Sequence, residues 1–276
     1  MKVITVYNKK GGVSKTSTAI SMASYLNKYE NKNVLFIDLD PQCDATHQFK
    51  KIGTSPCAFE LVSKTANLFD CMIALKTEMT EDKKITRINL ALIPAVKELE
   101  YVPVQLCTKI SSYMNLKEAI TNDPNVEKMF DYIIIDCNTN FNLLVAMALI
   151  ASDYLLIPAE GDISSVDALK SLKDEFDENN IQILNKDLKI AGVLLTKKQT
   201  VGRNETVNYR EIKEDLKRKA RELFDSPVFN TEIRTSINMP NARSKGLSIF
   251  EYDPECSVAK DYFAFMEEFL HTIGEK

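Results

Sequence analysis

Short runs of aliphatic and β-branched residues alternate with longer amphipathic stretches from one end of the chain to the other. Runs in which nearly every position is apolar are typical of strands buried on both faces of a sheet. They occur at Val3–Tyr7, Val34–Asp38, Leu90–Ile93, Tyr132–Asp136, Tyr154–Ile157, Ile190–Thr196 and Val228–Ile233. The periodicity of amphipathic helices occupies Thr16–Tyr29, Ser111–Thr121, Leu143–Ala151, Ser164–Glu178, Tyr209–Phe224 and Val258–Ile273.

The repeated order of strand and helix predicts the fold class. Parallel strands joined by helices form an α/β domain with right-handed crossovers, in which helices cover the sheet. We therefore expect a single doubly wound domain over residues 1–276, with a mostly parallel central sheet flanked by helices on both faces. Asp70–Asn89 and Lys197–Asn208 have the least regular patterns, and we expect them to be insertions on that domain.

Composition narrows the class of protein. The six cysteines include no CxxC pair, which favours reduced thiols in a cytoplasmic protein over a metal clip or a disulfide framework. The apolar run at the N-terminus is too short for a signal peptide, and no stretch of about 18 apolar residues predicts a membrane span. The formal net charge of −4 argues against a protein that coats nucleic acid or an anionic membrane at all times.

The turn after the first predicted strand is the strongest candidate for chemistry. Asn8-Lys9-Lys10-Gly11-Gly12-Val13-Ser14-Lys15-Thr16 lies between that strand and an amphipathic helix. Such a turn presents backbone N–H groups and a helix N-terminus to an anion, and its glycines let the backbone approach closely. Lys15 would reach the β- and γ-phosphates of a nucleotide, and the Thr16 hydroxyl would bind Mg²⁺. The alternative is a lysine-rich turn capped by Ser14 or Thr16, but the position between strand and helix favours a nucleotide site.

Carboxylates follow two further predicted strands. Asp38 and Asp40 end the second strand in the sequence Asp-Leu-Asp-Pro, and Asp136 ends the run that begins at Tyr132. Because the carboxyl ends of parallel strands border the ligand crevice, these side chains are expected to face a bound nucleotide. Asp136 would hold Mg²⁺ through water, since Mg²⁺ keeps most of its hydration shell. The alternatives are ordinary turn chemistry at the Asp-x-Asp-Pro exit and a buried strand that simply ends in aspartate.

Taken together, these motifs resemble those of the ParA/MinD superfamily of ATPases. Lys10–Thr16 is similar to the deviant Walker A box of that family, in which the early lysine is the signature, and Asp38–Gln42 is similar to its DxDPQ box. Further similarity lies at Thr231–Ala242 and at Gly246–Pro254, which contains the family's closing EYDP sequence. The resemblance extends over roughly residues 2–270.

The resemblance is weakest over Pro56–Asn89 and departs from the family at one loop. The run Tyr132–Asp136 has the form of the family's Walker B strand, which a Thr-Pro-Pro turn usually follows. Here Cys137-Asn138-Thr139-Asn140 stands in its place, so the lining of the dimer face is expected to differ. What the resemblance implies is a P-loop NTPase fold of the deviant Walker A type that binds ATP and Mg²⁺.

The resemblance also implies a role for each candidate residue. Lys10 would cross to the ATP of the partner subunit in a sandwich dimer, as an arginine finger does in trans. Asp40 would orient the attacking water, and Asp38 would support the Mg²⁺ shell. The predicted catalytic residues are thus Lys10, Lys15 and Asp40, and the predicted metal residues are Thr16, Asp38 and Asp136. The predicted nucleotide-binding residues are Lys10, Gly11, Gly12, Val13, Ser14, Lys15, Thr16 and Ser17.

The charge is unevenly distributed, which changes the expectation about nucleic acid. Residues 196–246 contain twelve basic and seven acidic side chains, so a local positive excess lies within an acidic chain. A local excess can contact DNA phosphates without reading bases. Family members of the partition type bind DNA in this third of the chain, and the candidates here are Arg203, Arg210, Arg234, Arg243 and Lys245. The alternative is a solvated helix face, because Tyr209–Phe224 also carries opposite charges at helical spacing.

The resemblance favours a DNA partition ATPase. Its ATP-bound homodimer would bind nucleoid DNA non-specifically, and a ParB-like centromere-binding protein would stimulate slow hydrolysis. A MinD-like membrane-associated positioning ATPase is the alternative, but it needs a basic amphipathic C-terminal helix, whereas Asp261–Leu270 is acidic. An electron-transfer protein like the nitrogenase iron protein needs two cluster cysteines, and Cys137 alone is suitably placed. We also do not expect an autoregulatory repressor, because the first strand begins near residue 2 and leaves no room for a preceding helix-turn-helix.

Overall fold

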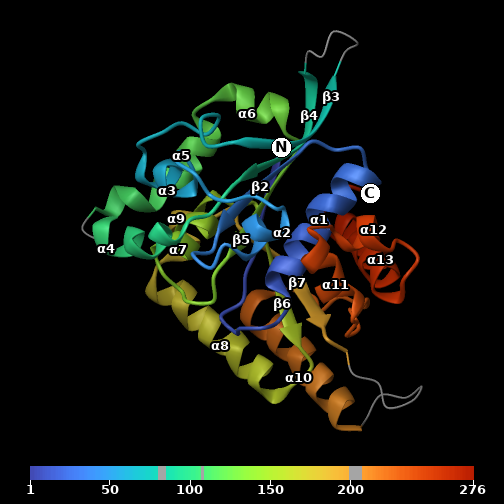
Figure 1. Cartoon of the computed structure of the whole chain (residues 1–276). Helices are drawn as coiled ribbons and strands as arrows, with labels where there is room; N and C mark the ends of the chain where they lie inside the picture. Colours follow the sequence, from blue (N-terminus) through green and yellow to red (C-terminus); the bar gives the residue numbers. More distant parts are fainter. Residues whose placement is uncertain (80–84, 107–108, 199–206) are drawn as a thin grey trace.

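The computed structural model describes residues 1–79, 85–106, 109–198 and 207–276. Its central feature is a seven-stranded sheet in the order β3-β4-β2-β5-β1-β6-β7 (Figure 1). The strands are β1 Lys2–Val6, β2 Val34–Leu39, β3 Ile73–Met79, β4 Ile85–Ile93, β5 Tyr132–Cys137, β6 Tyr154–Glu160 and β7 Lys189–Thr196. Among the described strands, β3 and β4 pair antiparallel and all other pairs are parallel.

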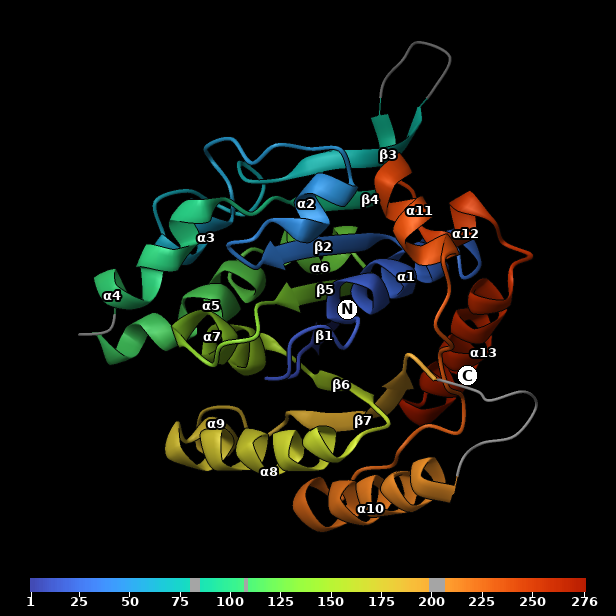
Figure 2. The same cartoon turned by 60° about the horizontal axis from the view of Figure 1, so that its bottom comes forward.

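Helices cover both faces of this sheet (Figure 2). Their bounds are α1 Lys15–Lys28, α2 Asp44–Gln48, α3 Ala58–Ser63, α4 Val102–Leu106, α5 Asn115–Thr121, α6 Pro124–Met129, α7 Leu143–Ala151, α8 Ile163–Glu178, α9 Ile181–Leu184, α10 Val207–Phe224, α11 Asn238–Lys245, α12 Ile249–Tyr252 and α13 Ser257–Thr272. Two 3-10 helices span Lys97–Tyr101 and Ile110–Met114. This arrangement confirms the predicted α/β fold class with a mostly parallel sheet.

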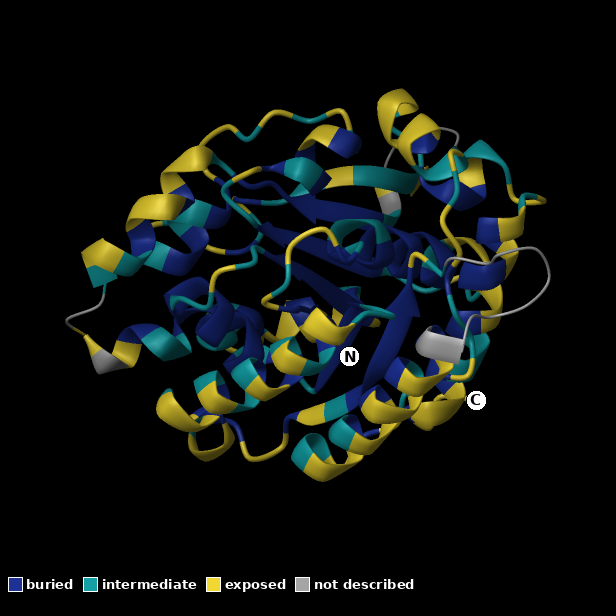
Figure 3. Ribbon diagram, turned by 90° about the horizontal axis from the view of Figure 1, so that it is seen from below, coloured by how far each residue is buried: buried dark blue, intermediate teal, exposed yellow. Residues whose placement is uncertain are grey.

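The hydrophobic core consists of two layers because the strands are apolar on both faces. Ile133 and Ile135 of β5 pack with α3, α5, α7, α8 and α10, whereas Ile134 packs with α1, α11, α12 and α13. Figure 3 shows the central strands buried and the outer faces of α8 and α10 exposed. A strand with alternate side chains in two cores has no solvent-facing side, which explains the continuous apolar runs. None of the described helices is long and apolar enough to cross a membrane.

Two sequence predictions about strands are wrong. The stretch Asp70–Asn89, predicted as an irregular insertion, contains β3 and most of β4, which pair as an antiparallel hairpin at the sheet edge with several register shifts. An edge strand is only partly buried, so β3 lacks the continuous apolar run of the central strands.

The stretch Val228–Ile233 follows β7 but is not a strand. It makes one isolated bridge, between Val228 and Val193. The backbone N–H groups of Asn230 and Thr231 instead donate to the carboxylate of Glu268 on α13, at 2.7 and 2.9 Å. A side chain that takes these donors interrupts the ladder that a strand requires.

Candidate functional site

The glycine-rich turn joins the carboxyl end of β1 to the first residue of α1, Lys15. Gly12 and Ser14 both have left-handed backbone conformations, with φ of 79° and 65°. The side-chain amide of Asn8 donates to the carbonyl of Pro158 at 2.7 Å, and the hydroxyl of Thr196 donates to the carbonyl of Val13 at 3.1 Å. Strands β6 and β7 therefore hold the turn in place from one side.

Lys15 lies inside this turn and is almost completely buried, with 8% of the residue exposed. Its ammonium group donates to the backbone carbonyl of Lys10 at 3.3 Å. Burial lowers the pKa of Lys15, and the nearby Asp136 and Asp40 partly oppose that effect. A buried ammonium held by one weak neutral acceptor is suited to bind an anion, because a phosphate oxygen would compensate the charge better than a carbonyl.

Asp136, at the end of β5, is fully buried. Among the described residues, no group makes a hydrogen bond to either of its carboxylate oxygens. Burial, and next the charge of Asp38, raise the pKa of Asp136 well above its ordinary value, while the adjacent Thr16 hydroxyl and Lys15 act in the opposite direction. An unpaired buried carboxylate is costly unless a cation compensates it.

These groups fit a magnesium ion. Mg²⁺ prefers oxygen ligands and is commonly held by one or two protein groups together with water and substrate phosphates. The Asp136 carboxylate and the Thr16 hydroxyl would be the protein groups here. When bound, Mg²⁺ would neutralise negative charge on the β- and γ-phosphates.

Asp38 and Asp40 occupy different environments although only one residue separates them. Asp38 is fully buried and lies opposite Asp136 in the register of β2 and β5. Its oxygens accept hydrogen bonds from the Asp40 N–H at 3.1 Å and from the N–H and hydroxyl of Thr46 at 2.8 and 2.7 Å. Burial raises the pKa of Asp38 to about 6, against the effect of these hydrogen bonds.

Asp40 is only partly buried and lies closer to solvent than Asp38. One of its oxygens accepts a hydrogen bond from the Gln42 N–H at 2.9 Å. Burial raises its pKa, and Lys15 opposes that rise. Among the described residues, one oxygen of Asp40 thus has no hydrogen-bond donor, whereas both oxygens of Asp38 accept hydrogen bonds.

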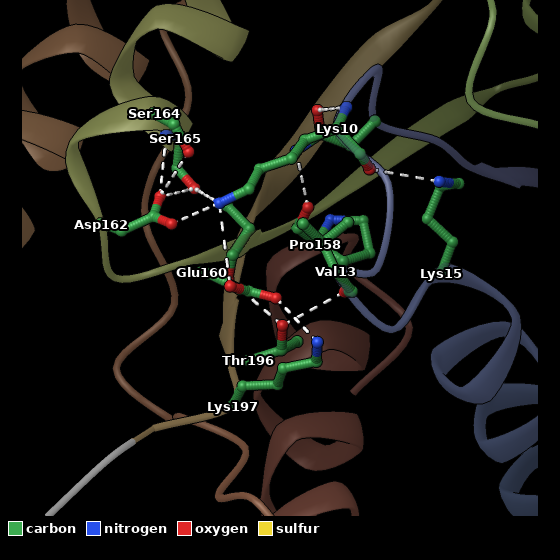
Figure 4. Close-up of polar contacts among 12 residues, drawn as sticks. Lys10, Val13, Lys15, Pro158, Glu160, Asp162, Ser164, Ser165, Thr196 and Lys197 are labelled. Carbon is green, nitrogen blue, oxygen red and sulfur yellow. Dashed lines mark hydrogen bonds and ion pairs between the residues drawn. The ribbon is translucent and has the colours of Figure 1, made fainter.

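Lys10 extends away from Lys15 and toward the start of α8 (Figure 4). Its ammonium forms an ion pair with Asp162 and lies 3.7 Å from Glu160 Oε2 and 3.5 Å from Ser165 Oγ. Glu160 also binds Lys197, with its Oε1 2.9 Å from the lysine Nζ. In this structure, acidic groups of its own chain thus hold Lys10.

The acidic partners of Lys10 are not among the residues predicted from the sequence. Glu160 ends β6, the strand next to β1, so the rule that singled out Asp38 and Asp136 also applies to it. Asp162 is the N-cap of α8, where it accepts the Ser165 N–H at 3.0 Å, and the sequence pattern alone is typical of a helix cap.

The basic residues proposed to contact DNA are spread over separate elements. Arg234 makes two hydrogen bonds of 2.7 Å to the Asp261 carboxylate, and Arg243 pairs with Asp44 at 2.5 Å. Lys245 lies 5.0 Å above the ring of Tyr252.

Two candidates for DNA contact remain, Arg210 and Arg203. Arg210 is exposed on α10, which packs on α8, whereas the α11 residues Arg243 and Lys245 lie beside α12 and α2. Arg203 lies outside the described residues. Among the described residues, Arg210 thus packs beside different elements from Arg243 and Lys245.

A glycine-rich turn after the first strand of a mostly parallel, helix-covered sheet is the arrangement of the P-loop proteins. A family model described as an AAA domain matches residues 1–190. The sporulation initiation inhibitor protein Soj of Bacillus subtilis is 31% identical over 97% of this chain and 97% of its own length. The chromosome-partitioning ATPase Soj of Treponema pallidum is 26% identical over 100% of this chain and 99% of its own length. The chain belongs to the ParA/MinD superfamily and is a ParA-like ATPase.

Solved structures show the same fold. A McdA variant from Cyanothece in complex with ATP has a TM-score of 0.82 and 23% identity, over 100% of this chain and 97% of that one. A plasmid partition protein of Borrelia burgdorferi bound to AMPPNP has a TM-score of 0.75 and 23% identity, over 98% of both chains.

Proposed function

We propose that this chain is a Mg²⁺-dependent partition ATPase whose ATP-bound homodimer binds DNA non-specifically and releases it after slow hydrolysis stimulated by a ParB-like protein. The observation that carries the ATPase part is the buried Asp136 carboxylate, which has no hydrogen-bond donor among the described residues and lies next to Thr16 and Lys15. A cation and a phosphate together would compensate these buried charges. The similarity to two Soj proteins supports the partition part.

Each residue of the site would have a distinct task. Backbone N–H groups of residues 10–17 and the Lys15 ammonium would bind the β- and γ-phosphates. Thr16 and Asp136 would hold Mg²⁺, and Asp38 would support the shell of ligands around the ion. Asp40 would accept a hydrogen bond from the attacking water and orient it in line with the γ-phosphate.

Lys10 would act in the partner subunit. To reach the partner's ATP its ammonium must leave Asp162 and Glu160, and phosphate oxygens would then replace these carboxylates. The Lys10 side chain is only 20% exposed, so the exchange substitutes one set of anionic acceptors for another and does not transfer a bare charge from water. Its positive charge would stabilise the transition state from across the dimer.

DNA binding would use the ion pair that costs little to break. The side chains of Arg243 and Asp44 are 52% and 42% exposed, and a pair with this exposure contributes little to stability, so a DNA phosphate could replace Asp44. Arg234 is held more firmly, because it donates twice to Asp261, whose side chain is only 11% exposed. Arg243 and Lys245 share α11, and a second subunit in the dimer would double the number of such basic groups that one DNA duplex can contact.

The membrane-associated alternative has no support in the last helix. The apolar face of α13, including Phe265, Phe269 and Leu270, is buried against α1 and the sheet. An amphipathic helix that docks on a membrane must keep that face available. A buried Cys137, whose thiol pKa burial raises well above its usual range, is likewise poorly suited to the thiolate ligation of an iron–sulfur cluster.

A salt-titrated DNA-binding assay tests the proposal. Fluorescence anisotropy of a labelled duplex of arbitrary sequence would be measured with ATP and Mg²⁺, with ADP and Mg²⁺, and without nucleotide. We expect binding only with ATP, and an affinity that falls steeply with salt. Arg243→Ala should reduce the slope of log K against log salt by about 1 if that side chain contacts a phosphate. Equal binding in all three nucleotide states would refute the switch.

A further inference from the structure

Thr46 links the loop that carries Asp40 to the end of a neighbouring strand. The backbone N–H of Ala95, just after β4, donates to the Thr46 hydroxyl at 2.9 Å. That hydroxyl donates in turn to Asp38 Oδ2 at 2.7 Å, and the Thr46 N–H reaches the same oxygen at 2.8 Å. The other oxygen of Asp38 accepts the Asp40 N–H at 3.1 Å. A continuous chain of hydrogen bonds thus runs from β4 to the backbone of Asp40.

The direction of each hydrogen bond in this chain is determined by its partners. A backbone N–H can only donate and an ionised carboxylate can only accept, so the hydroxyl of Thr46 must accept from Ala95 and donate to Asp38. Both Thr46 and Asp38 are fully buried, so neither contact is exposed to solvent. The hydroxyl is therefore required here as donor and acceptor together.

The end of β4 is a firm anchor for this connection. The Ala58 N–H donates to the Pro94 carbonyl at 3.0 Å, which ties the start of α3 to the same point. Gly53 approaches so closely that a Cβ at that position would lie 2.1 Å from the Ala95 carbonyl oxygen. The segment that follows α2 is thus packed against residues 94 and 95.

Asp40 depends on this anchor for its position. Among the described residues, its own side chain accepts a hydrogen bond from the Gln42 N–H, two residues further along the chain. The backbone N–H of Asp40 donates to Asp38, and Thr46 supplies two of the three hydrogen bonds that hold Asp38. A shift of Asp38 would consequently move the Asp40 carboxylate relative to the phosphate-binding turn.

We propose that Thr46 is a positioning residue for ATP hydrolysis, which acts through Asp38 to hold Asp40 where it orients the attacking water. This inference rests on the ATPase activity proposed above. Misplacement of a reacting group by about 1 Å can cost up to 100-fold in rate, while binding by the rest of the site is retained. Loss of the Thr46 hydroxyl should therefore reduce turnover and leave nucleotide binding intact.

The test compares Thr46→Val, which keeps the shape but removes the hydroxyl, with Thr46→Ser, which keeps the hydroxyl. Thr5→Val is the matched control. Thr5 lies on β1, away from α2, and is also fully buried, and its hydroxyl lies 2.7 Å from Ser152 Oγ. Phosphate release would be followed over a range of ATP concentrations with Mg²⁺ and duplex DNA. Equilibrium binding of a fluorescent ATP analogue would establish that each variant is folded and binds nucleotide.

We expect Thr46→Val to lower kcat by about 10- to 100-fold with KM for ATP within about twofold of the wild type. Thr46→Ser should retain kcat within about threefold, and Thr5→Val should leave it unchanged. A Thr46→Val protein with wild-type kcat, or a Thr46→Ser protein as slow as Thr46→Val, would overturn the inference. Absence of ATP hydrolysis by the wild-type protein would instead refute the proposed function.

Discussion

Replacing Asp136 by asparagine should make the nucleotide-free protein more stable, and increasingly so as the pH rises. The pKa of Asp136 is raised well above its ordinary value, with burial as the largest cause and Asp38 as the next. In the unfolded chain the same carboxyl group titrates near about 3.9. Between these two pKa values the folded state holds a proton that the unfolded state has lost, so the contribution of this group to stability falls as the pH rises.

The magnitude follows from this linkage. In the interval where only the unfolded state is ionised, the free energy of unfolding of the wild type loses about 1.4 kcal/mol per pH unit through Asp136. Asparagine does not titrate, so Asp136→Asn lacks this loss. The difference in stability between variant and wild type should grow from about pH 4 upward and level off at the pKa of the folded carboxyl group.

Asp38→Asn is the matched control because Asp38 is equally buried but fully hydrogen-bonded. Its pKa is raised to about 6, so its own pH effect has the same sign but is confined to the interval between about 4 and 6. An amide at this position would turn an NH₂ group toward the N–H of Asp40 or the N–H and hydroxyl of Thr46. We expect Asp38→Asn to lose about 1–3 kcal/mol for the unsatisfied buried group.

Urea unfolding followed by circular dichroism, in EDTA and without nucleotide, would measure these effects from pH 5 to pH 8. Curves of stability against pH that run parallel for Asp136→Asn and the wild type would refute the description of Asp136 as an uncompensated buried carboxylate. Addition of ATP and Mg²⁺ should narrow the difference between the variant and the wild type. A ligand at 100 times its Kd stabilises the wild type by about 2.7 kcal/mol, and the variant should gain little from Mg²⁺.

The other predictions concern the three proposed catalytic residues. Lys15→Ala should abolish ATP binding in isothermal titration calorimetry, because it removes the buried ammonium of the turn; an unchanged Kd would contradict the site. Lys10→Ala should bind ATP as a monomer but form no dimer with a non-hydrolysable analogue in analytical ultracentrifugation, whereas dimers equal to those of the wild type would exclude a role in trans. Asp40→Ala should accumulate as a persistent ATP dimer that releases little phosphate, and wild-type phosphate release would show that another group orients the water.

The elements that the sequence predicted well are those whose pattern depends only on their own residues. The helix Leu143–Ala151 has the predicted bounds, because an apolar run follows the Asn142 cap directly. Strands β1, β2 and β5 are buried on both faces and therefore have an unmistakable composition. By contrast, β3 is a half-exposed edge strand whose identity depends on pairing with β4.

The same distinction holds within the candidate site. Lys15 and Thr16 belong to a contiguous motif, and Asp38, Asp40 and Asp136 follow strands whose carboxyl ends must meet at one edge of a parallel sheet. The contacts of Lys10 with Asp162 join residues about 150 positions apart in the sequence. No local pattern encodes such a pair, and the proposed role of Thr46 likewise depends on the backbone N–H of Ala95, which follows β4 and is 49 positions away.

The sequence by itself determined the fold class, the phosphate-binding turn and the acidic strand ends, because backbone geometry and periodic burial are properties of short segments. Only the tertiary structure decided which of these groups have partners. It leaves Asp136 without a hydrogen-bond donor among the described residues, surrounds Asp38 with donors and directs Lys10 to acidic groups of its own chain. The physical reason is that the free energy of a buried charge depends on the atoms packed around it, and distant segments supply those atoms.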